Sequence, residues 1–389
     1  MDRSSLTYLG FLALLFTQAW ISRTLPRKAA AHWKGRKLLA ARAAIHGFGA
    51  AVVACDLLSC LPAGTPAWLP EWLSAVLGGL AAAYAICATG GLCLWLALRS
   101  VRKHLNAETD PSRRHALNTA GALVAAGPFA AVGYGALVQR IDFHVREVDV
   151  PIRGLAQDLD GLRIVQLSDI HLSAFLSESE FARAVDAANE LRPNLAVVTG
   201  DLITGPGDPL DACIRQIARL KADAGVFGCM GNHEKMARAE DYAERAAAAA
   251  GVRFLRQSSQ RLAFGAASLN LAGVDYQSFR HKEEYLRGAG ALREHGAFNL
   301  LLSHNPDTFP AAARQGWNLQ LSGHTHGGQV NVEILDQGIN PARFFTPYVY
   351  GLFERGASAA YVTRGIGTLG IPVRLGAPPE IAVLRLRKA

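Results

Sequence analysis

The sequence of 389 residues contains only six cysteines, and their distribution excludes two common uses of this residue. Four of them lie inside apolar stretches, at Cys55, Cys60, Cys87 and Cys93. Only Cys213 and Cys229 remain for the rest of the chain, which indicates neither a disulfide framework nor a zinc site built from thiolates. Cys229 lies in a predicted buried strand, where it is interpreted as a small, inert apolar side chain.

Acidic residues are scarce in the first 150 residues, which hold 15 Lys and Arg but only 8 Asp and Glu. Residues 151–389 hold 25 Lys and Arg and 24 Asp and Glu, so nearly all of the formal charge of +8 belongs to the first part. The basic residues there fall between apolar stretches. They indicate a membrane-topology signal rather than a nucleic-acid-binding surface, and no nucleic-acid partner is expected.

Long apolar stretches occupy the first part of the chain, at residues 6–21, 38–61, 72–98 and 116–138. Each is close to or above the roughly 17 to 25 residues that a membrane-crossing helix needs, and the first is the shortest. We therefore predict an all-α transmembrane region of about four helices over residues 1–140. Arg42, His46 and Asp56 within it are interpreted as structural, because Arg42 and Asp56 lie near opposite ends, where long side chains reach the interface.

The segments between these stretches differ in basic content. Residues 23–37 hold six Lys and Arg and no acidic residue, residues 62–71 hold no basic residue, and residues 99–115 hold five. Because basic loops stay on the cytoplasmic side, we predict a multi-pass membrane protein whose chain beyond the fourth stretch is periplasmic or extracellular. Residues 112–117, S-R-R-H-A-L, also resemble a twin-arginine export signal, although retention of basic residues on the cytoplasmic side explains them equally well.

Beyond these stretches the composition changes. Residues 141–160 are mixed and polar, and we interpret them as a linker to a globular domain over residues 161–389. Strand-like runs at 162–167, 195–199, 225–230, 297–303 and 319–321 are combined with helical runs at 179–191 and 209–222 and a strand pair at 261–274. This alternation predicts an α/β layered domain, in which ligands cluster after the carboxyl ends of strands.

Polar motifs follow these strands. They read L-S-D-I-H-L at 167–172, T-G-D-L at 199–202, G-N-H-E at 231–234, L-S-H-N-P-D at 302–307 and S-G-H-T-H-G-G-Q at 322–329. His324 and His326 alternate with a threonine, so they point the same way from an extended strand end. A single histidine is more often an ordinary core or surface residue, but all these motifs together predict a metal site of carboxylate and imidazole ligands.

The ordered pattern D-x-H, G-D, G-N-H-[DE], H and G-H-x-H resembles that of the calcineurin-like metallophosphoesterase superfamily, over roughly residues 155–389. The extended motif G-H-T-H-G-G-Q resembles the membrane-associated or exported bacterial branch of that superfamily. The resemblance implies a four-layer sandwich of two mixed β-sheets flanked by helices. It also implies two metal sites, whose ligands would be Asp169, His171 and His326 for the first, Asn232, His304 and His324 for the second, and Asp201 as the bridge.

The implied activity is metal-dependent hydrolysis of a phosphodiester or pyrophosphate by a hydroxide shared between two divalent ions, with Mn, Fe and Zn all compatible. His233 corresponds to the superfamily's non-ligand histidine, which stabilises the phosphate or protonates the leaving oxygen. Glu234 stands where many members have Asp and would support the site. Arg364 and Arg374, in the closing segment 361–375, are candidate ligands of the substrate phosphate, with a surface ion pair as the alternative for each.

A membrane-anchored catalytic domain favours a phosphate-ester substrate near the membrane, including lipid-linked and nucleotide–sugar–lipid esters. Two other functions remain open on the sequence alone, a phosphomonoesterase of broad specificity and a non-catalytic membrane scaffold that retains the fold. The helices are equally compatible with simple anchoring and with a transport unit.

Overall fold

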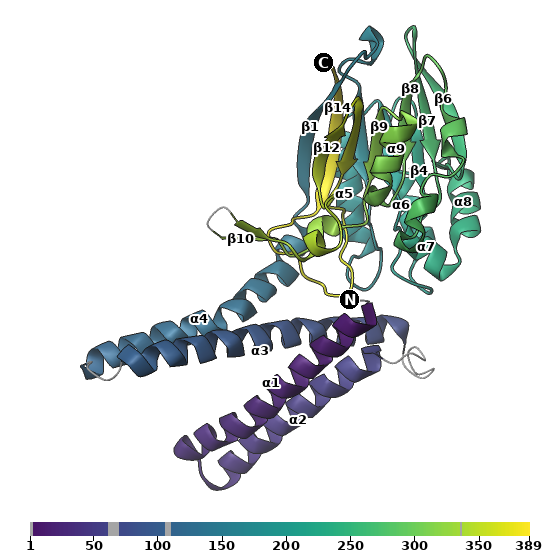
Figure 1. Cartoon of the computed structure of the whole chain (residues 1–389). Helices are drawn as coiled ribbons and strands as arrows, with labels where there is room; N and C mark the ends of the chain where they lie inside the picture. The colour runs from purple at the N-terminus through teal and green to yellow at the C-terminus, as the bar shows by residue number, and fades with distance from the viewer. Residues whose placement is uncertain (1–2, 61–69, 106–109, 335–336) are drawn as a thin grey trace. The chain divides into compact units, whose positions relative to one another are not determined.

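The computed structural model describes residues 3–60, 70–105, 110–334 and 337–389, which form two compact units (Figure 1). The first unit comprises Met1–Ala136 with Gly370–Pro372, and the second comprises Leu137–Leu369 with Val373–Ala389. All residues of the predicted metal site belong to the second unit.

The first unit consists of the helices α1 (Arg3–His32), α2 (Gly35–Cys60), α3 (Glu71–Leu105) and α4 (Pro111–Leu137). Among the described residues, three stretches are long and apolar enough to cross a membrane: Gly35–Leu57, Trp72–Ser100 and Thr119–Ile141. The expected helices are present, but α1 is not among these candidate spans. Its apolar run ends at Ile21, and the helix continues into a basic segment.

The basic segment 23–37, expected as a loop, lies mainly in helices, because α1 continues to His32 and α2 begins at Gly35. Most of the predicted loop at 62–71 and part of that at 99–115 fall on residues 61–69 and 106–109, outside the described residues, and Glu71 already begins α3. The side chains of Arg113 and Arg114 in the segment that resembles an export signal also lie outside the described part of the chain.

Two six-stranded mixed sheets form the second unit, and Figure 1 shows them face to face. The first sheet has the order β1 (His144–Ile152), β14 (Glu380–Lys388), β2 (Arg163–Leu167), β3 (Leu195–Thr199), β4 (Val226–Cys229) and β5 (Arg253–Phe254). The second has the order β12 (Gly351–Arg355), β13 (Ser358–Val362), β9 (Leu319–Ser322), β8 (Phe298–Leu302), β7 (Ala267–Gly273) and β6 (Ser258–Phe264). A separate hairpin pairs β10 (Val332–Ile334) with β11 (Gln337–Ile339).

The central strands are buried on both faces, which explains their continuous apolar runs. In β2, Ile164 packs in the core between the sheets, whereas Val165 packs against the helices on the outer face. That outer face is covered by α5 (Glu178–Glu190), α6 (Leu210–Ile217) and α8 (Glu240–Ala249). The outer face of the second sheet is covered by α9 (Phe309–Gln315), so the unit is the expected four-layer sandwich.

Strand β1 corrects the interpretation of residues 141–160 as a linker. It pairs in parallel with β14 along its whole length, from His144↔Glu380 to Ile152↔Lys388. Its sequence, H-V-R-E-V-D-V-P-I, is polar because β1 lies at the edge of the sheet and most of its side chains are exposed, with only Val150 and Ile152 fully buried. An edge strand also tolerates Pro151, which has no backbone N–H to donate.

The strand directions bring the motif loops to one edge of each sheet. Strands β2, β3 and β4 run parallel to one another in the first sheet, as do β7, β8 and β9 in the second. Beneath the loops, Gln166 Nε2 of β2 donates hydrogen bonds to Ser322 O of β9 and to Thr199 Oγ1, both at 2.9 Å. These bonds hold the two loop-bearing edges together.

Leu300 is fully buried between the sheets, so Leu300→Ala is expected to destabilise the second unit by about 2 to 5 kcal/mol through the cavity that it leaves. Cys229, fully buried in the same core, reports opening because its thiol is then alkylated. Mass spectrometry over a temperature series should show alkylation of Cys229 at a lower temperature in the variant. Leu352→Ala, half-buried on β12, is the control, and an equal shift in both variants would contradict this description of the core.

Candidate metal centre

The predicted site residues follow the carboxyl ends of strands in both sheets. Asp169 and His171 follow β2, Asp201 follows β3, Asn232 and His233 follow β4, His304 follows β8, and His324 and His326 follow β9. Three groups of these side chains have ligand atoms within 4.8 Å of one another: Asp169, His171 and His326; His171, Asp201 and His233; and Asp201, His304 and His324. The structure therefore brings together residues that lie up to 157 positions apart in the chain.

In the first group, two imidazoles direct nitrogen atoms at each other. His171 Nε2 lies 3.1 Å from His326 Nε2, and the rings stack with their centroids 4.9 Å apart. Asp169 Oδ1 lies 3.4 Å from His326 Nε2, so a carboxylate oxygen adjoins the pair. Lone pairs from three side chains converge here, as the ligands of a divalent cation do.

Asp201 lies between the first and the third group. Its Oδ2 is 3.5 Å from His171 Nε2 and 3.1 Å from His304 Nε2. Its Oδ1 accepts a hydrogen bond of 2.9 Å from the backbone N–H of His233, which fixes the carboxylate plane. One carboxylate oxygen thus lies close to both groups, the position that a carboxylate shared by two neighbouring cations requires.

Backbone carbonyls fix the orientation of the imidazole rings. His304 Nδ1 donates to Thr199 O and His233 Nδ1 donates to Thr204 O, each at 2.6 Å. Because a carbonyl oxygen only accepts, each Nδ1 carries a hydrogen and each Nε2 is left to face the cluster. Partners of this kind set the tautomer of metal-binding histidines.

Several buried ligand atoms have no hydrogen-bond partner among the described residues. They include Asp169 Oδ2 and Asn232 Oδ1, while His304 Nε2 faces Asp201 Oδ2 at 3.1 Å. Burying polar atoms without a partner costs free energy, so their clustering at one place needs a compensating group. Carboxylate oxygen, amide oxygen and imidazole nitrogen are all ligands of divalent transition metals, and the residues present therefore fit a metal centre.

Burial and charge pairing shift the pKa values of these groups. Burial raises the pKa of Asp169 and lowers that of His326 well below its usual range. For His304, burial is outweighed by the facing Asp201 carboxylate, which raises its pKa to about 10. Burial also opposes the charge of Asp201, but His304 and His171 hold its pKa well below the usual range. Without a cation, the charge of Asp201 is therefore balanced by His304.

The ligand loops have an unusual backbone conformation. Non-glycine residues take positive φ angles at Asp169 (50°), His171 (47°), Asp201 (56°), His324 (75°) and His326 (53°). A positive φ angle costs conformational free energy in a residue that has a Cβ, and it persists only where surrounding contacts impose it. Those contacts include the hydrogen bonds of Asp169 N to Gly200 O and of His171 N to Asp201 O, each 3.0 Å.

Two motif glycines are required by close packing against the carboxylates. A Cβ on Gly231 would lie 2.1 Å from Asp201 Oδ1, and one on Gly323 would lie 2.2 Å from Asp169 Oδ2. Any larger residue at either position would displace a carboxylate of the cluster. The glycines in G-N-H-E and G-H-T-H are therefore part of the site although they carry no ligand.

Glu234 supports the site through the backbone, in line with its expected role. It is fully buried, and its Oε2 accepts from Asp201 N at 3.0 Å and from Gly231 N at 2.8 Å. Its Oε1 accepts from Leu202 N at 2.7 Å. One carboxylate thus joins the loops after β3 and β4.

Arg374 corrects the prediction of a substrate ligand. It is fully buried, and its guanidinium donates to Gly367 O at 3.1 Å, Ala377 O at 3.0 Å and Arg364 O at 2.9 Å. Burial lowers its pKa to about 10. Because the guanidinium is used on backbone carbonyls of the closing segment, Arg374 orders that segment and is not available to a substrate phosphate.

Arg364 differs from Arg374 because part of its side chain, 17%, is exposed. Its guanidinium lies over the ring of Tyr350, 4.4 Å from the centroid, and its Nε is 3.9 Å from Glu380 Oε2. Its Cγ would lie 2.8 Å from a Cβ on Gly327, so it packs against the loop that carries His326. The structure thus places Arg364 beside the metal centre.

Sequence reasoning did not find Tyr276 and Thr204. The Tyr276 ring lies 5.5 Å from that of His324 and 6.0 Å from that of His304, measured between centroids. Thr204 contacts two site histidines, with its Oγ1 3.2 Å from His171 Nδ1 and its carbonyl bonded to His233. Neither residue belongs to a polar motif, and the only signal for Tyr276 was its position just after a predicted strand.

Comparison with known proteins assigns this fold and site to a class. The profile described as calcineurin-like phosphoesterase matches residues 162–328. The chain is 30% identical over 271 residues to the uncharacterised metallophosphoesterase YkuE of Bacillus subtilis (strain 168), covering 69% of this chain and 93% of that relative. It therefore belongs to the calcineurin-like metallophosphoesterase family, whose members are metal-dependent phosphoesterases.

Two further relatives carry additional information in their names. The chain is 30% identical over 258 residues to a transmembrane protein with metallophosphoesterase domain from Danio rerio, covering 63% of this chain and 57% of that protein. It is 29% identical over 228 residues to phosphodiesterase YaeI of Escherichia coli (strain K12), covering 58% of this chain and 82% of that protein. Membrane association is thus supported both by relatives and by the apolar helices.

The variant Glu234→Gln tests the support of the site by Glu234. Its amide NH₂ would face backbone N–H groups in place of an accepting oxygen, so we expect a loss of stability of about 1 to 3 kcal/mol and weaker Mn²⁺ binding. Alkylation of Cys229 on heating and metal titration of purified protein measure the two effects. Glu283→Gln, on an exposed residue, should match the unchanged protein, and a Glu234 variant that did the same would refute the role.

Proposed function

We propose that the second unit is a dinuclear-metal phosphoesterase, anchored to a membrane by the first unit, that cleaves phosphodiester or pyrophosphate bonds. The observation that carries the proposal is the position of Asp201 between two groups of buried ligand atoms. One cation would be held by Asp169, His171 and His326, and the other by Asn232, His304 and His324, with Asp201 shared. The unpartnered atoms on Asp169 and Asn232 support this assignment.

Two divalent cations would supply positive charge opposite the developing charge on the phosphoryl oxygens and would bring the pKa of a bound water near neutrality. We propose that His233 handles a proton at the leaving oxygen. Its Nδ1 is bonded to Thr204 O, while its buried Nε2 has no hydrogen-bond partner among the described residues. Burial lowers the pKa of its ring to about 4, and an adjacent phosphate anion would favour the protonated form that donates from Nε2.

Arg364 is the residue proposed to bind the substrate phosphate. Its guanidinium is held over Tyr350 and stays partly exposed, so it keeps donors for an anion beside the histidine loop. A non-catalytic scaffold would not require this arrangement or the full set of ligand residues, and for that reason we favour an enzyme.

The substrate class is proposed to be a phosphodiester near the membrane. The relative named phosphodiesterase and the candidate membrane spans of this chain support it. Lipid-linked esters combine both properties, because their phosphate lies at a membrane surface.

Assays of the full chain with Mn²⁺ test the reaction class. We expect hydrolysis of bis-p-nitrophenyl phosphate in clear preference to p-nitrophenyl phosphate, and Asp201→Asn should reduce it by about a hundredfold or more, because the cations lose the anion between them. Asp186→Asn, on an exposed carboxylate, is the matched control and should stay active. Full activity in Asp201→Asn would place the reaction elsewhere, and a preference for the mono-ester would make the protein a phosphomonoesterase.

The second unit is proposed to lie on the periplasmic or extracellular side. The basic segment 23–37 lies at the start of the candidate span Gly35–Leu57, and Arg99, Arg102 and Lys103 lie at the end of the span Trp72–Ser100. By the positive-inside rule, these two basic regions lie on the cytoplasmic side. The last span then leads outside. This outcome does not depend on whether α1 also crosses the membrane, because its crossing would change only the side of the amino terminus.

Labelling of single introduced cysteines in a Cys60→Ser, Cys93→Ser background tests this topology. A membrane-impermeant maleimide applied to cells with a permeable outer envelope should label Ala266→Cys in the second unit and not Lys34→Cys between α1 and α2. Both positions are exposed, so accessibility within the protein does not limit either reaction. Labelling of Lys34→Cys alone would reverse the assigned orientation.

A further inference from the structure

The last candidate span joins the second unit at the edge that carries the metal centre. The span ends at Ile141, and only Asp142 and Phe143 separate it from strand β1. At up to about 3.6 Å per residue, the start of β1 lies within about 11 Å of the end of the span. The connection along the chain between the span and the sheet is therefore short.

Strand pairing fixes which end of the sheet this is. His144, the first residue of β1, pairs with Glu380 at the start of β14, and β14 is antiparallel to β2 with Ala382 opposite Gln166. The start of β1 is thus level with the end of β2, where Asp169 follows. The chain enters the second unit on the edge at which the ligand loops lie.

The residues that end the span are bonded to the second unit. Gln139 Oε1 accepts from Gly376 N at 2.7 Å, and Arg140 Nη2 lies 3.7 Å from Glu180 Oε1. These contacts lie within the second unit, to which residues 137–141 belong. They hold residues 139 and 140 on the second unit itself.

Three exposed phenylalanines lie on segments that border the metal centre. Phe344 is 87% exposed, Phe345 64% and Phe279 55%. The segment that carries the first two is bonded to the histidine loop, since Asn340 Nδ2 donates to Gly327 O at 2.8 Å. Phe279 follows shortly after Tyr276, whose ring contacts His324. Since His324 and Tyr276 are themselves only half-buried, these segments border the open side of the site.

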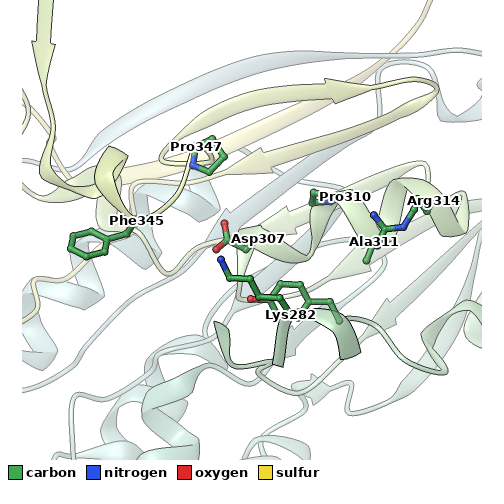
Figure 2. A pocket seen from close by; sticks show the side chains of 8 residues that line it. Lys282, Asp307, Pro310, Ala311, Arg314, Phe345 and Pro347 are labelled. Atoms are coloured by element: carbon green, nitrogen blue, oxygen red, sulfur yellow. The ribbon is translucent and has the colours of Figure 1, made fainter. Parts of the chain in front are cut away.

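The two phenylalanine-bearing segments face one another across a cavity of about 290 Å³ (Figure 2). Lys282 and Tyr285 line it from the Phe279 segment, and Phe345 and Pro347 line it from the other, and Asp307 and Arg314 also line it. Phe345 lines this cavity itself, whereas Phe279 and Phe344 lie on the two segments that line it. We call Phe279, Phe344 and Phe345 the aromatic rim.

Basic residues accompany the aromatic rim. Arg280, Lys282 and Arg343 are exposed beside it. Of the two neighbouring glutamates, Glu284 lies 3.3 Å from Arg287, which offsets its charge. Exposed aromatic rings with adjacent Lys and Arg are the composition that binds the interface of a membrane with anionic lipids.

We propose that the aromatic rim inserts into the interface of an anionic phospholipid bilayer and holds the metal centre against that surface. The bilayer is the favoured occupant because the chain enters this same edge from a candidate span and because the rim carries basic residues. The contact with lipid is independent of catalysis. Its consequence for turnover, access to phosphate esters embedded in the bilayer, rests on the proposed phosphoesterase function.

Photo-crosslinking tests the contact without reference to activity. The full chain would carry p-benzoylphenylalanine in place of Phe344 and be reconstituted in nanodiscs of phosphatidylcholine and phosphatidylglycerol. We expect phospholipid adducts at position 344 and none from the same group at Ala266, which is exposed in the turn at the opposite end of the second sheet. Adducts only to a second copy of the chain, or no adducts, would overturn the proposal.

Activity provides the second readout. The double variant F344S/F345S should hydrolyse soluble bis-p-nitrophenyl phosphate like the unchanged protein, but should lose about tenfold in the hydrolysis of a bilayer-embedded lipid phosphodiester. If the double variant and the unchanged protein hydrolysed the embedded ester at equal rates, the proposed membrane contact of the aromatic rim would be overturned. Absence of activity on both substrates in the unchanged protein would reject the proposed function instead and leave the crosslinking result to decide the lipid contact.

Discussion

The second unit depends on one costly constraint, the burial of several carboxylate, amide and imidazole groups at a single place between two sheets. Asp169 and Asn232 each hold a buried atom without a hydrogen-bond partner among the described residues, and His171 and His326 direct nitrogen atoms at each other. Such a cluster is unfavourable unless cations lie within it. Much of the surrounding structure can be understood as holding these groups in place against that cost.

The support comes from hydrogen bonds between buried charged side chains and the backbone of the loops. Glu234 binds three backbone N–H groups, and Arg374 binds the carbonyls of the closing segment, so each buried charge organises a loop. Backbone hydrogen bonds of Asp169 and His171, and the bond of Glu234 to Asp201 N, accompany the positive φ angles of these three residues. Strain of this kind, fixed by well-bonded loops, is typical of sites whose geometry is set before a ligand binds.

Much of the fold was predictable because the central strands of both sheets are buried on two faces and leave continuous apolar runs. Strand β1 was missed because an edge strand with exposed charges has the composition of a linker. The site residues could be identified because their motifs follow the strand ends directly. Arg374 was misread because a sequence does not distinguish an arginine that binds a ligand from one that binds carbonyls in the core, and Thr204 belongs to no motif.

The central claim is that two cations share Asp201, and metal stoichiometry tests it most directly. Purified full chain, loaded with Mn²⁺ and freed of excess metal, should contain two ions per chain by elemental mass spectrometry, as the paired ligand groups require. Asp201→Asn should lower this content, because both ions lose a ligand. A single ion per chain, or a content that Asp201→Asn leaves unchanged, would contradict the account.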